Sequence, residues 1–441
     1  MVQDQSSWRS WLPRVATLDL VYLLAYGTRQ VPSLVVGPLR QSLHLSDVQI
    51  GLIQGFAFLL VYAISALVLS RIVDRGNRVR LVVVCLFVWS VLTVVSGLAD
   101  DFAMLLITRI GMAMSQSIIP VTALSIIYDI TPRASVPRAS VIFMMAAYIG
   151  GGAAFMFGGP LLVWLGQYQG QAVMGFGSFE PWRGVFILAG LPGIVVGFLI
   201  FLFMREPQRR VEPVQAAAQG SLIAFLRHNA RFLLCLMTMV AMINLVNITV
   251  LSWIPAFLMR VHHMAAGEAG VAAGITLVAS GICGCMLGTY LMSQDNDAVA
   301  LSHVVRMMVK LVTLLFVPLV LMPLMPLPQV GLGLLALDVV LLSAILSSAL
   351  TPLQLFAGND VRGRAMAVGA LYTAAISGLG PVVVGALTDR IFHAPEAINY
   401  ALAITFGVVG IIAMVAGWPA ARMALRIDRA AAASRIPSIA S

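Results

Sequence analysis

The stretch Asp74-Arg75-Gly76-Asn77-Arg78 lies in a short gap between two apolar runs, 48–70 and 81–99. Each run is long enough to cross a bilayer, and the gap also holds Arg71 and Arg80. One explanation of this charge is topology, because cationic loops stay in the cytoplasm. The other is that Asp74 and the arginines form ion pairs that hold the end of a moving helix pair closed.

The composition of the whole chain agrees with a membrane protein. Of 441 residues, 60% are hydrophobic and 10% charged, which leaves too little polar surface to cover a water-soluble body. A spanning helix needs about 20 mostly apolar residues, and long helices exclude a transmembrane barrel of short alternating strands. The predicted fold is therefore all-α and integral to the membrane. Its twelve predicted transmembrane helices cover 16–39, 48–70, 81–99, 103–128, 138–165, 184–204, 230–258, 267–293, 303–326, 330–357, 365–389 and 397–421.

The positions of the basic residues predict an orientation. When the loops are assigned alternately to two sides, one side holds most of the arginines and the other holds only Arg40, Arg183, Arg260 and Arg390. Both termini are therefore predicted to be cytoplasmic. The net charge of +9 is explained by short loops that face anionic lipid headgroups, so the bilayer and not a nucleic acid is the expected partner. The location expected for such a chain is the bacterial inner membrane.

A polar link near the middle divides the chain into two halves. The predicted order is a cytoplasmic tail, an N-terminal six-helix bundle, a cytoplasmic linker, a C-terminal six-helix bundle and a second tail, over 1–15, 16–204, 205–229, 230–422 and 423–441. A shift of 226 residues places Arg138 on Arg364 and Gly152 on Gly378. Parallel repeats of this kind are typical of transporters that move two bundles around a midplane site.

The first predicted helix carries a polar stripe. Asp19, Tyr22, Tyr26, Arg29 and Ser33 recur at intervals of three and four residues, which places them on one face. An arginine at the centre of a spanning helix costs roughly 2.5 to 3.5 kcal/mol. Arg29 is therefore predicted to meet a cavity, a carboxylate or an anionic ligand, unless its side chain reaches the outer surface.

Other polar residues within predicted spans are candidates for substrate contacts. Arg109 and Gln116 lie seven residues apart on one face of the fourth helix, where Arg109 either faces a cavity or anchors the outer interface. Asn244 and Asn247 of the seventh helix are either ligand contacts or interhelical hydrogen-bond partners.

Two carboxylates are candidates for ion coupling. Asp19 and Asp338 lie within predicted spans, and Asp338 is the one carboxylate well inside a helix of the second half. A carboxyl group at membrane depth can bind a proton and release it when water enters. A structural hydrogen bond is the alternative role.

The chain resembles the major facilitator superfamily over essentially its whole length. Asp74-Arg75-Gly76-Asn77-Arg78 is similar to that family's loop between helices 2 and 3, and Leu105, Arg109 and Gly111 are similar to its helix 4 pattern. The resemblance implies alternating access and a cytoplasmic gate. The residues that this resemblance assigns to the gate are Asp74, Arg75, Arg78, Asp129 and Arg138.

Four further motifs resemble the spinster-like branch of this superfamily. They are Gly51-Leu52-Ile53-Gln54, Pro181-Trp182-Arg183, Arg205-Glu206-Pro207, and Gly380-Pro381 followed by Gly385 and Asp389. The branch usually places an Asp before the arginine of helix 1 and a Glu seven residues beyond that of helix 4, where this chain has Thr28 and Gln116. Neither side chain titrates. If transport is proton-linked, Asp19 or Asp338 must substitute; otherwise the protein is a uniporter or an exchanger.

The two arginines without their acids predict a net positive cavity. The expected function is therefore transport of a small organic anion or anionic amphipath by a monomer, with Arg29, Arg109, Tyr22, Tyr26, Gln116, Asn244 and Asn247 as substrate contacts. A drug efflux pump is the main alternative, supported by the glycines of 150–152 and 158–159. A receptor or scaffold is a remote alternative. An enzyme is not expected, and no pattern for a metal or a cofactor is found.

Overall fold

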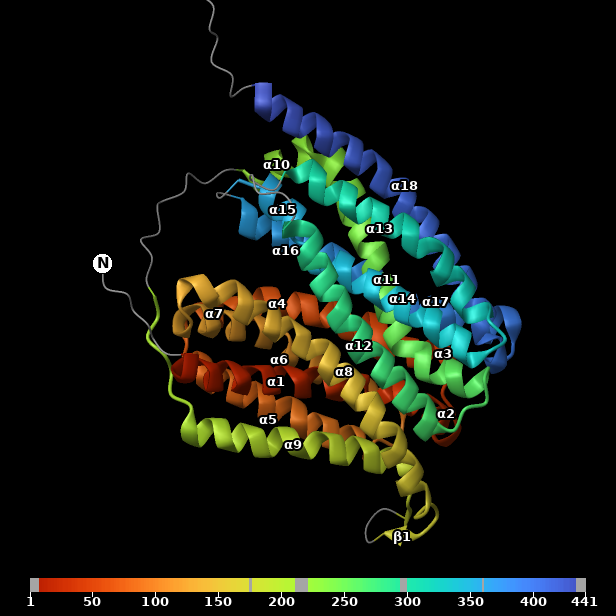
Figure 1. Cartoon of the computed structure of the whole chain (residues 1–441). Coiled ribbons are helices and arrows are strands. Elements are labelled where there is room, and N and C mark those ends of the chain that lie inside the picture. Colours follow the sequence, from red (N-terminus) through yellow and green to blue (C-terminus); the bar gives the residue numbers. More distant parts are fainter. Residues whose placement is uncertain (1–7, 174–176, 211–220, 294–299, 359–360, 434–441) are drawn as a thin grey trace, which may run out of the picture. The chain divides into compact units, whose positions relative to one another are not determined.

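Long helices make up the computed structural model, which describes residues 8–173, 177–210, 221–293, 300–358 and 361–433 (Figure 1). Eleven helices of the described residues are long and apolar enough to span a membrane. The first helix is long enough but carries Asp19 and Arg29 within its apolar run. Helices cover each of the twelve predicted spans, so the predicted all-α, twelve-helix membrane fold is confirmed.

The helices of the first half end close to their predicted bounds, with several interruptions. They are α1 (Trp8–Leu34), α2 (Val36–Ser42), α3 (Asp47–Gly51), η1 (Leu52–Phe56), α4 (Ala57–Arg75), α5 (Arg78–Ser96), α6 (Phe102–Gln116), α7 (Ile119–Ile130), η2 (Arg133–Ser135), α8 (Val136–Gly166) and α9 (Pro181–Phe203). Two two-residue strands, β1 (Ala172–Val173) and β2 (Gly177–Ser178), pair antiparallel between α8 and α9.

The second half repeats this pattern of long and interrupted helices. Its elements are α10 (Leu222–His228), α11 (Ala230–Arg260), α12 (Ala266–Ser293), α13 (Leu301–Leu321), η3 (Met322–Leu324), α14 (Pro328–Ser347), α15 (Thr351–Phe356), α16 (Arg362–Ser377), α17 (Leu379–Ala386), η4 (Leu387–Phe392), η5 (Pro395–Ala397) and α18 (Ile398–Ala433). The short α10 lies within the predicted linker, and α18 continues beyond the predicted end of the last span.

The chain folds into two compact units. Unit 1 comprises 1–213, 250–279 and 381–398, and unit 2 comprises 214–249, 280–380 and 399–441. In unit 1, α1 packs along α8 and α5 along α9 (Figure 1). The bundle boundaries predicted at 204 and 230 remain a prediction, since the compact units assign the C-terminal end of α11 and the N-terminal end of α12 to unit 1.

Small residues allow the closest helix contacts of unit 1. A Cβ atom on Gly150 of α8 would collide with the backbone of Leu23 in α1, and one on Gly274 of α12 would lie 2.5 Å from the carbonyl oxygen of Gly152. A helix backbone can approach another this closely where the residue facing it has no side chain. The glycine run of α8 therefore serves helix packing, whatever else it does.

Two segments of the described residues are π-helical, and both lie in unit 1. They are η1, which continues α3 into α4, and η4, near the end of the eleventh span. A π-helical turn displaces backbone carbonyls from their usual i to i+4 partners and is frequent at functional sites. η1 lies next to the buried arginine of the fourth span, where one of its carbonyls is used.

Candidate functional site

Two arginines meet inside unit 1 and form the centre of the candidate site. Arg109 of α6 is 1% exposed. Its Nε donates to the carbonyl oxygen of Ile53 in η1 at 3.1 Å, and its Nη2 donates to the carbonyl oxygen of Arg29 in α1 at 3.2 Å. Nη1 is buried with no hydrogen-bond partner among the described residues. Carbonyl groups of the first and second spans thus hold the guanidinium of the fourth span, and its Nη1 is unused.

Arg29 lies beside this buried arginine and shares an aromatic partner with it. The guanidinium carbon of Arg29 lies 4.7 Å from the ring centroid of Phe58, and that of Arg109 lies 4.8 Å from the same centroid. Tyr26, one turn earlier on α1, adds a ring at 5.6 Å from Arg29. Aromatic faces stabilise a cation without neutralising it, so two positive charges share one apolar wall.

No carboxylate pairs with either guanidinium within the described residues. At the two positions where an acid was missing from the sequence, the neutral side chains bond each other: Gln116 Nε2 donates to the hydroxyl oxygen of Thr28 at 3.2 Å. Thr28 in turn donates to the carbonyl oxygen of Leu24. The hydrogen bond between Gln116 and Thr28 therefore links α1 to α6, and neither side chain supplies a negative charge.

The rest of the polar stripe on α1 contacts two neighbouring elements, α8 and η1. Tyr22 stacks on Phe143 of α8 with centroids 4.4 Å apart and meets Tyr26 edge-on at 5.1 Å. Ser33 donates to the side-chain oxygen of Gln54 in η1 at 3.4 Å. Asp19 is partly buried, and its Oδ1 has no hydrogen-bond partner in the described part of the chain. Tyr22 therefore packs against α8, while Tyr26 and Arg29 remain partly exposed.

Unit 2 holds the remaining predicted contacts. Asn244 of α11 donates through Nδ2 to the hydroxyl oxygen of Ser377 in α16 at 3.1 Å, and Asn247 is partly exposed one turn later. Asp338 of α14 is fully buried, and neither carboxylate oxygen has a hydrogen-bond partner among the described residues. A structural role through hydrogen bonds is therefore not visible for Asp338.

At the end of unit 1 that holds the signature loop, Arg78 is the centre of a network of ion pairs and hydrogen bonds. We call it the inner network, after the cytoplasmic side predicted for this loop. Its side chain is 1% exposed and forms ion pairs with Asp129 of α7 and, at 2.7 Å, with Glu206 beyond α9. It also donates to the Ser125 hydroxyl at 3.0 Å and to the Pro207 carbonyl at 3.1 Å. The structure thus joins Arg78 and Asp129, as the resemblance implied.

Other predicted gate residues lie differently. The side chains of Asp74 and Arg75, in the last turn of α4, lie outside the described residues. Arg138 is exposed on α8, with no ion pair to Asp129 in the part of the chain that the structure describes.

Residues that sequence reasoning missed complete the inner network. Glu206 also accepts from the backbone N–H of Val79 at 2.9 Å. The guanidinium of Arg209 donates to the carbonyl oxygens of Val73 and Gly76, each at 2.7 Å. Arg210 donates to the Thr131 carbonyl at 2.9 Å. The start of the predicted linker is therefore fixed to the signature loop and to the end of α7.

A second network, which the sequence did not reveal, lies in unit 1 at the helix ends opposite the signature loop. We call it the outer network, after the side predicted for this end. Asp47, in the first turn of α3, is fully buried and accepts two hydrogen bonds from Arg260 at the end of α11, at 2.7 and 3.0 Å. The hydroxyl of Thr388 in η4 donates to the same carboxylate at 3.0 Å. Asp389 accepts from the backbone N–H of Val48 at 2.9 Å. Residues of the first and second halves of the sequence are joined here.

Close backbone contacts accompany this outer network. A Cβ atom on Gly51 would lie 2.5 Å from the carbonyl oxygen of Pro381, and one on Gly385 would collide with the carbonyl of Asp47. Trp253 of α11 is fully buried and donates through Nε1 to the Pro381 carbonyl at 3.2 Å. The two motif glycines therefore bring the second and eleventh spans together at this end.

Glu180 marks the same end of α9. It accepts from the hydroxyl of Ser42 at 2.6 Å, from Trp182 Nε1 at 2.8 Å and from Arg183 Nε at 3.2 Å. Burial opposes ionisation of this carboxyl group, but the three hydrogen bonds and the charge of Arg183 outweigh it and lower the pKa of Glu180 below its ordinary value. Arg183 also pairs with Asp100, which is 87% exposed.

The chain is similar to known proteins in sequence. The sequence profile of the Major Facilitator Superfamily matches residues 18–381. A curated relative, described as an MFS-type efflux pump of Mycolicibacterium smegmatis, is 27% identical over 417 residues, which are 93% of this chain and 92% of that protein.

Solved structures give the same result. A bacterial homologue of the human lysosomal transporter Spinster, inward-facing and unoccupied, is 25% identical with a TM-score of 0.79, over 96% of this chain and 98% of its own. The occupied form of that homologue, also inward-facing, gives a TM-score of 0.75 at 25% identity, over 96% and 97%. The xylose transporter XylE of E. coli, 12% identical with a TM-score of 0.68 over 93% and 95%, shares the fold alone. The chain belongs to the major facilitator superfamily and is a multi-pass membrane transporter.

Proposed function

We propose that this transporter moves a small organic anion or an anionic amphipath, which Arg29 binds directly and Arg109 supports. The observation that carries the proposal is the pair of guanidinium groups on one aromatic ring with no carboxylate partner in the described residues. Charge removed from water needs a counter-charge. A substrate carboxylate, phosphate or sulfate is the partner that would satisfy both arginines.

The neighbours of the two arginines favour a substrate with an apolar part. Phe58 and Tyr26 place ring faces beside Arg29, and Tyr26 itself is partly exposed. Aromatic rings bind apolar surface while the guanidinium binds the acid group. Gln116, Asn244 and Asn247 are the further polar contacts that we assign to the substrate.

We assign opposite gates to the two networks. The outer gate is Asp47 with Arg260 and Thr388, because it joins helices from both halves of the sequence. The inner gate comprises the signature residues Asp74, Arg75 and Arg78 with Asp129 and Arg138. Opening toward the outer side then requires the ion pair of Asp47 and Arg260 to break while substrate stays bound, whereas the ion pairs of Arg78 hold the helices of the inner gate's own half together.

Proton coupling, if present, is assigned to Asp338 or Asp19. Both carry a carboxylate oxygen without a hydrogen-bond partner in the described residues, and Asp338 is fully buried. A protonated carboxyl group costs far less to bury than a charged one. The neutral pair of Thr28 and Gln116 cannot take this role.

The loop charges support the proposed orientation. We place both termini in the cytoplasm and the protein in the bacterial inner membrane, acting as a monomer. The division into bundles over 16–204 and 230–422 belongs to the same proposal, as do the tails and linker that flank them.

Counterflow in proteoliposomes tests the substrate class. Vesicles loaded with one member of a panel of organic acids should accumulate the labelled acid, and matched cations and neutral analogues should not exchange. The same assay with and without a pH gradient tests coupling, because Asp338→Asn should abolish any proton-driven component and leave exchange. Exchange of cations but not of anions would refute the proposal.

Drug efflux is the second candidate function, favoured by the similarity to the M. smegmatis efflux pump. Deletion of the gene separates the two. Sensitivity to several unrelated cationic or neutral drugs favours efflux, whereas selective loss of growth on one organic acid favours anion uptake.

A further inference from the structure

A second basic site lies in unit 2, apart from the arginines of α1 and α6. A pocket of about 520 Å³ lies between the end of α12 and the beginning of α13, lined by Tyr290, Leu291, His303, Arg306, Met307, Lys310 and Leu311. Lys310 is the only lysine of the chain. Pockets of this size hold small ligands or headgroups.

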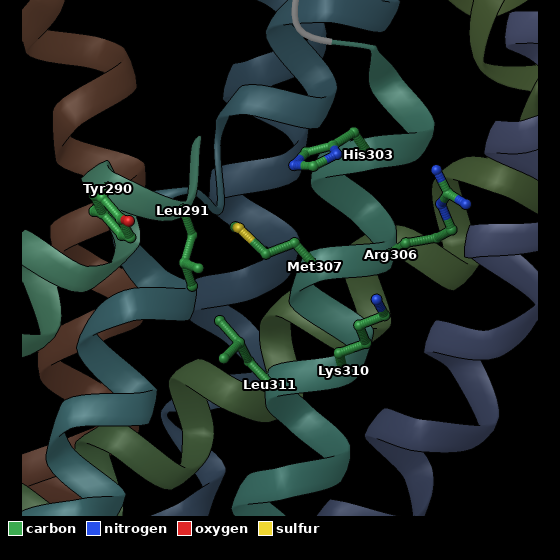
Figure 2. A pocket seen from close by; sticks show the side chains of 7 residues that line it. All are labelled: Tyr290, Leu291, His303, Arg306, Met307, Lys310 and Leu311. Carbon is green, nitrogen blue, oxygen red and sulfur yellow. The ribbon is translucent and has the colours of Figure 1, made fainter. Parts of the chain in front are cut away.

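The basic side chains of α13 are directed toward one end of the helix. Figure 2 shows Arg306 and Lys310 with their nitrogen atoms turned toward the N-terminal end of α13, while Met307 and Leu311 point toward Tyr290 and Leu291. Lys310 lies nine residues from the start of α13, which is about 14 Å along the helix. A lysine at that depth extends its stem along apolar surface and presents its ammonium at the headgroup level.

The charges at this pocket lack counter-charges. Neither Arg306 nor Lys310 forms an ion pair within the described residues, and both are exposed. Arg306 donates through Nε to the carbonyl oxygen of Ser302 at 3.2 Å. The carboxylate of Asp428 in α18 accepts from the backbone N–H of Ser302 at 2.8 Å. Arg306 is therefore held by the Ser302 carbonyl, and neither cation is neutralised by an ion pair among the described residues.

An apolar surface continues from the basic pocket along the same helix face. Leu314, Val317 and Leu321 follow Lys310 at intervals of four, three and four residues, and each is exposed. On α12, Met286 and Tyr290 are exposed one turn apart. A positively charged mouth above an exposed apolar track fits a molecule with an anionic head and hydrocarbon tails.

We propose that this pocket binds the headgroup of an anionic phospholipid of the cytoplasmic leaflet. The phosphate lies between Arg306 and Lys310, and the acyl chains lie along the apolar track of α13 and α12. Basic pockets at the cytoplasmic ends of helices attract such lipids. The side of the membrane rests on the orientation given under the proposed function, whereas the lipid class rests on the pocket alone.

Native mass spectrometry of the full-length transporter released from detergent tests the site. Phosphatidylglycerol should be retained in preference to phosphatidylcholine, which carries the same phosphate but no net charge. The double substitution Arg306→Gln with Lys310→Gln should weaken phosphatidylglycerol binding about 30-fold, since each basic residue contributes roughly a factor of five. Arg14→Gln with Arg80→Gln removes two exposed arginines elsewhere and should leave binding unchanged.

Each other outcome refutes the site as proposed. Equal retention by the double variant and the wild type would remove the pocket as the binding site. Equal retention of the two lipids would remove the requirement for net negative charge. Displacement of the lipid by millimolar glycerol phosphate would show a site for soluble phosphates and not for lipid.

The single variants Arg306→Gln and Lys310→Gln, each expected to weaken binding about fivefold, repeat the test if the double variant unfolds. Loss of organic-acid counterflow does not bear on any of these results.

Discussion

The inner and outer networks of unit 1 use the same chemistry in different ways. The inner network centres on Arg78 and draws both carboxylates, Asp129 and Glu206, from the first 206 residues of the chain. The outer network centres on Asp47 and draws Arg260 and Thr388 from the second half of the sequence. The inner network therefore contains residues of the first half of the sequence, whereas the outer network joins residues of both halves of the sequence.

This difference separates a structural role from a gating role. Ion pairs within one bundle can persist through a transport cycle, whereas pairs that join moving parts must break in it. We infer that Arg78 with Asp129 and Glu206 stiffens its own half throughout the cycle. Asp47 with Arg260 is then the pair whose rupture permits opening.

The largest expected effect is on stability, from Arg78→Gln. Loss of the guanidinium leaves Asp129 buried and Glu206 partly buried without their counter-charge, which costs roughly 3 to 5 kcal/mol of unfolding free energy. Denaturation of the purified protein in detergent measures this. Arg80→Gln, on an exposed turn of the same helix, should stay within about 0.5 kcal/mol of wild type. Equal effects of the two changes would show that the inner network is not structural.

The next largest effect is on conformation, from Asp47→Asn. The amide cannot neutralise Arg260, so the outer network should open more often. A cysteine placed at Val48, in a background without Cys85, Cys235, Cys283 and Cys285, should react with a water-soluble maleimide at least about tenfold faster, which corresponds to about 1.4 kcal/mol.

Asp100→Asn is the matched control for this measurement, because Asp100 pairs with Arg183 near the same end but is 87% exposed. Its labelling rate should equal that of the wild type. Unchanged labelling in Asp47→Asn would mean that the outer pair does not control access.

The smallest expected effect is the pH dependence from Glu180. Its pKa in the folded state lies below the unfolded value, so its stabilisation is present above the unfolded pKa and is lost as pH falls through the folded pKa. The glutamate is partly exposed, so a modest loss of melting temperature is expected in acid. Glu180→Gln should flatten this part of the melting profile, and an unchanged profile would argue against the role of Glu180.

The sequence predicted the spans well because a bilayer requires long apolar runs, which are a local property. The sequence did not predict the break between α1 and α2, the break between α6 and α7 or the π-helical η1. Such irregularities in a helix depend on how it packs against its neighbours.

The gate residues show the same limit. The family resemblance assigns Arg78 and Asp129 to the gate, whereas Glu206 appears in the sequence only as part of the motif Arg205-Glu206-Pro207, with no partner assigned to it. Asp47 follows the capping residue Ser46, so its sequence context suggests only a favourable charge in the first turn of a helix. Its side-chain hydrogen-bond partners Arg260 and Thr388 lie 213 and 341 residues away, and no local pattern encodes such contacts.

The most direct test of the proposed substrate is counterflow of an organic acid by Arg29→Gln. The guanidinium lies over Phe58 beside Arg109 without a carboxylate, so its loss should reduce anion exchange at least about tenfold at equal protein content in the vesicles. The control is Arg183→Gln, because Arg183 lies at the N-terminal end of α9 and pairs with Asp100. This variant should retain anion exchange within about twofold of the wild type. Wild-type exchange by Arg29→Gln would contradict anion binding at this arginine.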